Sequence, residues 1–169
     1  SIRIASKVRY GRNGFDLFIE SEKVSSWWQK LLELGVKPVG SDALKILRNL
    51  EGKAKWPDDG NDKTFIHNLG VNEECCAFDK GCYVGQEIIN RIDVKGLNNK
   101  KLLRLELETS IEIGAEIFLN GKRQGTLSSF CIHEGKNYGL AILKKTAWEA
   151  GTPLLLKSEN NEVKASTIG

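Results

Sequence analysis

Hydrophobic residues follow two different spacings in the first fifty positions. Residues 2–10 and 15–19 alternate loosely between apolar and polar side chains, and the residues between them, Gly11-Arg12-Asn13-Gly14, have the composition of a turn. This arrangement predicts a β-hairpin. From Val24 to Leu32 apolar residues recur every three or four positions, which predicts a helix. We interpret the two tryptophans of that stripe as core residues.

Helical spacing returns once and then gives way to a different pattern. Ser41 is placed to cap a second helix that runs to about Leu50. Residues 52–79 are polar and irregular, and a loop of that length inside a compact domain is usually functional, a lid, or disordered. After Gly96, short β-rich segments follow at regular spacing: Leu102–Leu107, Glu116–Leu119, Gln124–Phe130, Tyr138–Leu143, Pro153–Lys157 and Val163–Ile168. Asn120-Gly121, between two of them, is typical of a type I′ hairpin turn.

These patterns predict an α+β fold in two parts. Residues 1–96 form an α+β domain, and residues 97–169 form a small antiparallel β-barrel. A length of 169 residues suits one domain or two small ones. The mixture of 40% hydrophobic and 28% charged residues is that of a globular protein, which excludes disordered, collagen-like and coiled-coil classes.

Composition also excludes several kinds of partner. No apolar run approaches the ~20 residues of a membrane-spanning helix, and Ser1 opens no signal peptide, so no membrane partner is expected. Because the chain does not begin with Met, we expect residues upstream to be absent. The net charge of +3 is spread along the chain without a basic stripe, so there is no clear nucleic-acid surface.

Four cysteines are present, and their spacing limits their chemistry. They are Cys75, Cys76, Cys82 and Cys131, which form no CxxC pair. A disulfide framework and a zinc site are therefore not expected, and a reducing compartment fits better. No metal ligands are predicted.

The segment that carries the most distinctive chemistry runs from Lys80 to Arg91. It has the form of a glycine-flanked turn that leads into a helix, with Gly81 and Gly85 able to take backbone angles that other residues resist. Cys82 is expected near the helix N-terminus, close to Lys80 and within reach of Arg91. The partial positive charge of a helix N-terminus and the charges of nearby cations both favour the thiolate form, so Cys82 is a candidate reactive thiol. The competing interpretation is that a lone cysteine is a small buried hydrophobe.

This segment contains the sequence Lys80-Gly81-Cys82-Tyr83-Val84-Gly85-Gln86-Glu87. It resembles the K-G-C-[YF]-x-G-Q-E signature of the YgfZ-type folate-binding proteins, which are relatives of the aminomethyltransferase of glycine cleavage. Further positions resemble the family more loosely: Trp28–Gly40, Arg91, Gly96, Gly125–Ser129 and Tyr138–Ala141. The resemblance implies a ring of folate-binding parts that ends in a small barrel, with the N-terminal part of the family fold missing from this chain.

The resemblance also implies a function. It points to tetrahydrofolate as cofactor, to iron–sulfur proteins or their assembly machinery as partners, and to assembly or repair of iron–sulfur clusters as the process, with Cys82 as the functional thiol. The folate-binding residues that it suggests are Glu51, Lys80, Gly81, Tyr83, Gly85, Gln86, Glu87 and Arg91. A cytoplasmic location is expected, or the mitochondrial matrix if the protein is eukaryotic. No classical turnover is attached to the family, so enzymatic activity is left open.

Two departures from the family pattern keep alternatives open. In the L-R-x-E-x-G stretch the family glutamate corresponds to Leu50, and the acid stands at Glu51, a shift that turns a helical side chain by ~100°. His67-Asn68 replaces a common P-x-E. One alternative is an aminomethyltransferase proper, which moves a one-carbon unit to tetrahydrofolate and normally lacks the cysteine. The other is a non-catalytic interaction module with a decayed folate site.

Overall fold

The computed structural model describes residues 2–169, and the chain divides into two compact units between Leu47 and Arg48. The first unit opens with a hairpin of β1 (Ile2–Arg9) and β2 (Arg12–Ile19). Tyr10 and Gly11 join the strands with φ values of 51° and 71°, as a type I′ turn requires. The predicted hairpin is confirmed, with a turn shorter than the expected four residues.

A short 3-10 turn, η1 (Ser21–Lys23), leads from the hairpin into α1 (Val24–Glu33), and α2 (Ser41–Leu50) follows. Both helices lie where their spacing predicts. None of the described residues from 2 to 47 is buried, and Trp28 is 54% exposed. Trp28 is therefore not the core residue that the helical spacing predicted, and Trp27 is half-buried. One hairpin with the helices α1 and α2 offers too few elements to enclose a core.

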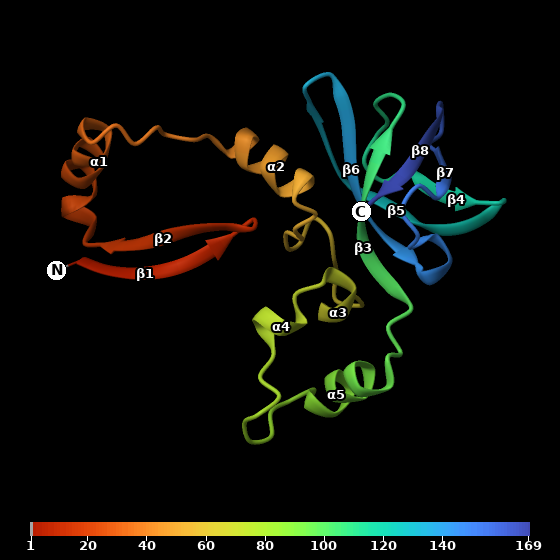
Figure 1. Cartoon of the computed structure of the whole chain (residues 1–169), viewed down its shortest axis with the longest axis horizontal. Helices are drawn as coiled ribbons and strands as arrows, with labels where there is room; N and C mark the ends of the chain where they lie inside the picture. The colour runs from red at the N-terminus through yellow and green to blue at the C-terminus, as the bar shows by residue number, and fades with distance from the viewer. Residues whose placement is uncertain (1) are drawn as a thin grey trace. The chain divides into compact units, whose positions relative to one another are not determined.

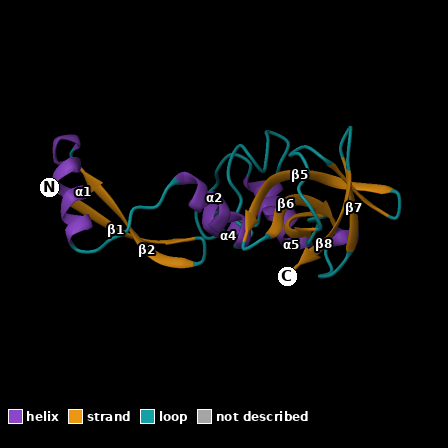
Figure 2. Ribbon diagram, turned by 90° about the horizontal axis from the view of Figure 1, so that it is seen from above, coloured by secondary structure: helices purple, strands orange, loops and turns teal. Residues whose placement is uncertain are grey.

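The second unit ends in a closed antiparallel barrel, whose strands surround the C-terminus in Figure 1. The six strands are β3 (Lys100–Leu107), β4 (Glu116–Leu119), β5 (Lys122–His133), β6 (Lys136–Lys144), β7 (Pro153–Lys157) and β8 (Glu162–Ile168). Their order around the barrel is β3-β6-β5-β4-β7-β8. The long strand β5 curves along the barrel in Figure 2. All six predicted strands are present, so the α+β class with a C-terminal barrel is confirmed.

Alternation of side chains explains why these strands close into a barrel. Along β3 and β8 alternate residues point inward, and the buried set includes Leu105, Ile117, Leu143 and Leu156, each fully buried. Asn120 and Gly121 have φ values of 48° and 73°, which confirms the predicted hairpin turn between β4 and β5. The barrel therefore holds the continuous apolar core of the chain.

Residues 48–99 connect the first unit to the barrel and contain three helices, α3 (Ile66–Leu69), α4 (Asn72–Cys75) and α5 (Gln86–Lys95). The connecting residues belong to the same compact unit as the barrel. The barrel itself begins at Lys100, near the expected boundary. The division into domains of residues 1–96 and 97–169 stays a prediction.

A buried ion pair joins the start of this connection to the barrel. The Arg48 guanidinium donates to the Asp59 carboxylate, and both side chains are almost completely buried. Ser129 of β5 accepts a hydrogen bond from Arg48 at 2.7 Å and donates one to Asp59 at 2.7 Å. Ser128 and the backbone amide of Lys55 also donate to Asp59, at 2.5 and 2.9 Å. The end of α2 and the loop at residues 53–60 are thus fixed to one strand of the barrel.

We expect Asp59→Asn to lower the free energy of unfolding by about 3–5 kcal/mol, because Arg48 would remain buried without a negative partner. Urea unfolding followed by circular dichroism measures the change. Asp58→Asn is the matched control, since Asp58 forms an exposed pair with Lys55 and such a pair contributes about 1 kcal/mol or less. An equal loss in both variants would contradict the special role of the buried pair.

Candidate functional site

The segment that carries the cysteine signature forms an exposed turn before α5. Gly85 caps the helix with a φ of 86°, a left-handed angle that favours glycine. Cys82 lies three residues before this cap and is exposed. The predicted turn into a helix is therefore confirmed, but Cys82 stands outside the first helical turn, where the field of a helix terminus declines.

The cations of this segment have partners other than the thiol. The Lys80 ammonium lies over the Tyr83 ring, 5.3 Å from its centre. Arg91 donates to Glu87 at 3.1 Å, one helical turn away. Gln86 is half-buried, and Gly81 and Glu87 are exposed. Arg91 thus forms an ion pair along the helix, and its expected proximity to Cys82 stays a prediction.

Two of the other three thiols, Cys76 and Cys131, are less exposed than Cys82. Burial raises the pKa of Cys76, and the neighbouring Cys75 and Asp93 raise it further. Burial also raises the pKa of the Tyr83 phenol, with a further contribution from Cys76, which lies near it. In the barrel, burial raises the pKa of Cys131 against the opposing charge of Arg48. Two of the four thiols are thus held in the protonated form at neutral pH.

Glu51, the carboxylate predicted to bind folate, lies on the surface. Glu51 follows the last residue of α2 and is exposed, in a turn that Gly52 closes with a φ of 63°. The preceding carbonyl, of Leu50, accepts a hydrogen bond from Arg104 of β3 at 2.5 Å. Leu50 itself is half-buried, so at this helix end the acid is the side chain open to a ligand.

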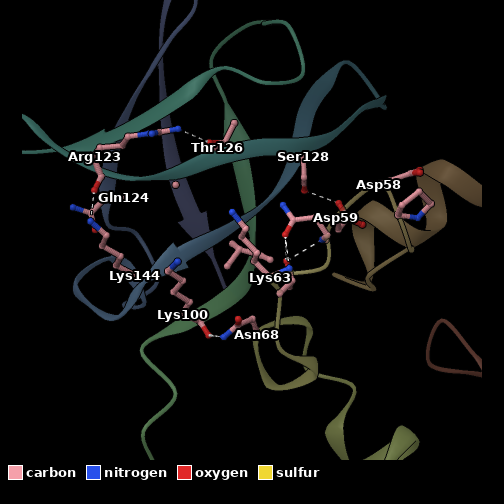
Figure 3. Close-up of a pocket in the computed structure, with 16 residues that line it drawn as sticks. Asp58, Asp59, Lys63, Asn68, Lys100, Arg123, Gln124, Thr126, Ser128 and Lys144 are labelled. Atoms are coloured by element: carbon pink, nitrogen blue, oxygen red, sulfur yellow. Dashed lines mark hydrogen bonds between the residues drawn. The ribbon is translucent and has the colours of Figure 1, made fainter. Parts of the chain in front are cut away.

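A polar pocket of about 660 Å³ lies between the connecting loop and the barrel, and Figure 3 shows its side chains. Its walls come from three places in the sequence: the loop at residues 57–64, the start of β3 at Lys100, and the facing strands β5 and β6. Sequence analysis marked the loop as functional because of its length but did not predict the pocket. Walls from segments so far apart leave no local pattern in the sequence.

The buried Asn68 and the half-buried Asn98 form a pair of hydrogen-bonded amides beside this pocket. The Asn68 side chain donates to the Asn98 side chain at 2.8 Å and to the Lys100 carbonyl at 3.1 Å, and Asn98 donates to the His67 carbonyl at 3.0 Å. The buried His67 ring places Nε2 3.8 Å from the carboxylate of Asp93 in α5. The short helix α3 therefore contacts both the pocket wall and the helix of the cysteine segment.

Comparisons with known proteins agree with the observed fold. The chain is 33% identical over 143 residues to the chloroplastic "putative transferase" of Arabidopsis thaliana, which covers 82% of this chain and 32% of that protein. It is 24% identical over 161 residues to the aminomethyltransferase of Rippkaea orientalis, which covers 94% of this chain and 44% of the relative. No family model matches the sequence.

Among solved structures, aminomethyltransferase T of the glycine cleavage system from Bartonella henselae superposes with a TM-score of 0.78 at 19% identity. The match covers 93% of this chain and 45% of that one. The fold is therefore aminomethyltransferase-like, and the chain spans less than half the length of these relatives. None of the described helices is long and apolar enough to cross a membrane.

We expect Cys82 to react first with substoichiometric iodoacetamide at neutral pH. Cys76 and Cys131 have pKa values raised by burial, so their thiolate fractions are small and grow only as the pH rises. Cys75 is exposed and is the internal comparison for Cys82. Peptide mapping by mass spectrometry measures each site, and preferential labelling of Cys75 or Cys131 would contradict the expectation.

Proposed function

We propose that the protein binds tetrahydrofolate and takes part in the transfer of a one-carbon unit, in the manner of aminomethyltransferases. The observation that supports this proposal most strongly is the extent of the similarity. Sequence similarity to an aminomethyltransferase runs over 94% of the chain, and the similarity of fold runs over 93% of it. A likeness of this extent includes both compact units and not the barrel alone.

Glu51 supplies the chemistry that a pterin requires. A pterin is flat and presents a row of donors along one edge, which a carboxylate can accept through two parallel hydrogen bonds. Glu51 is exposed at the end of α2, between the two residues of the buried pair, Arg48 and Asp59. In this proposal the pterin contacts that helix end and the 80–87 turn.

We expect Glu51→Gln in the full-length natural protein to weaken tetrahydrofolate binding by about 1.5–3 kcal/mol, the contribution of a hydrogen bond to a charged group. Titration calorimetry measures the affinity. Glu73→Gln, an exposed glutamate on α4, is the control and should leave the affinity unchanged. Wild-type affinity in Glu51→Gln removes this residue from the site, whereas no binding by the wild type refutes the function itself.

A second candidate function rests on the Lys80–Glu87 signature and on the exposure of Cys82 within it. In this proposal the protein maintains iron–sulfur enzymes in a folate-dependent way, and the Cys82 thiol is the working group. An aminomethyltransferase has no need of a thiol at this position. Dependence on Cys82 therefore separates the two candidates.

If Cys82 is the working thiol, Cys82→Ser should abolish support of iron–sulfur enzymes in cells while tetrahydrofolate affinity stays at the wild-type value. The activity of an iron–sulfur enzyme in a strain that carries the variant is the measurement. Cys75→Ser is the matched control, because Cys75 is exposed and lies outside the signature. Normal iron–sulfur activity in the Cys82→Ser strain would leave aminomethyl transfer as the better proposal.

A further inference from the structure

The polar pocket beside the barrel carries more positive than negative charge. Four cationic side chains line it: Lys63, Lys100, Arg123 and Lys144. They come from the loop, from β3, from β5 and from β6, so they converge from separate segments (Figure 3). Two carboxylates, Asp58 and Asp59, also line the pocket.

The carboxylates do not neutralise these cations, because both have partners elsewhere. Asp59 is paired with Arg48 and buried, and Asp58 is paired with Lys55 at 2.9 Å. Arg123 is balanced by Glu116, whose carboxylate lies 3.1 Å from its Nε.

The three lysines remain without a counter-charge. Within residues 2–169, none of Lys63, Lys100 and Lys144 has a carboxylate within ion-pair distance. Lys144 donates to the Arg123 carbonyl at 2.9 Å, a contact that holds the ammonium in place and leaves its charge uncompensated. All three lysines are exposed, so water screens their mutual repulsion, and their combined positive charge attracts an anion into the cavity.

The pocket is built before any ligand arrives. Its loop wall is tied to β5 through Asp59, which accepts hydrogen bonds from Ser128 and Ser129. Its floor is tied to β3 through Asn68, which donates to the Lys100 carbonyl. A volume of about 660 Å³ lies within the range of sites for small molecules. A neutral donor lines the same wall, since the Thr126 hydroxyl accepts a hydrogen bond from Arg123 at 3.2 Å and keeps its own proton to donate.

We propose that this pocket binds a small dianionic group, either a phosphate or a pair of neighbouring carboxylates. Both share the chemistry that the pocket offers: two negative charges, several acceptor oxygens and no donors that would need buried partners. The site is distinct from the exposed Glu51 and Cys82, and the proposal holds independently of folate binding because no part of it requires a pterin.

The test uses inorganic phosphate and glutarate as probes, titrated separately into the full-length natural protein at low ionic strength. Amide chemical shifts should change saturably for Lys63, Gly125 and Thr126. The double variant K63Q/K100Q should weaken the binding of both probes at least about tenfold, as the loss of charge-assisted contacts predicts. Saturation by phosphate alone identifies a phosphate site, and saturation by glutarate alone identifies a dicarboxylate site.

The control variant is K101Q/K122Q, which removes the same charge from exposed lysines of β3 and β5 that do not line the pocket. It should bind both probes with wild-type affinity. The proposal is overturned if neither probe gives saturable shifts in the wild type. It is also overturned if the control loses as much affinity as K63Q/K100Q, because attraction by net charge would then explain the binding.

Discussion

The buried pair of Arg48 and Asp59 fixes the end of α2 and the loop at residues 53–60 to strand β5. Two charges inside a protein carry a desolvation penalty of several kcal/mol each, and their attraction offsets it only when the remaining hydrogen bonds are also made. Here the Asp59 carboxylate also accepts hydrogen bonds from Ser128, Ser129 and the backbone amide of Lys55. A pair with such exact requirements permits one arrangement of the end of α2, the loop and β5, so it selects a geometry more than it adds stability.

The barrel could be predicted from the sequence because its information is local. Buried and more exposed residues alternate along β7 and β8, and Asn120-Gly121 encodes its own turn. Burial of helices could not be predicted in the same way. Helical spacing identified α1 and α5, yet Trp28 is 54% exposed and Ile88 55%. An apolar stripe shows that a helix has a face to cover, but the elements that cover it lie elsewhere in the chain or outside it.

The candidate sites also differ in whether their residues are close together in the sequence. Cys82 could be identified from the sequence because it forms one short motif with Gly81 and Gly85. In the structure its thiol is exposed on the surface. The pairing of Arg91 was not predicted, although a cation one helical turn from Glu87 is placed to form an ion pair with it. The lysine pocket was missed entirely. Lys63, Lys100 and Lys144 are separated by long stretches of chain. Pairing of β3 with β6 sets Lys100 opposite Lys144, and the loop that Asp59 holds to β5 adds Lys63 to the same cavity.

The helix α3 is the structural link between these two regions. Asn68 lines the pocket and donates to Asn98, while the neighbouring His67 lies 3.8 Å from Asp93 on the helix that follows the cysteine turn. Coupling between two sites requires an element with two arrangements that each site favours differently. The amide of Asn68 is already committed to two acceptors, Asn98 and Lys100, so a second arrangement of α3 would break buried hydrogen bonds. The helix acts as a fixed support, and the pocket and the cysteine turn can therefore carry separate chemistry on one frame.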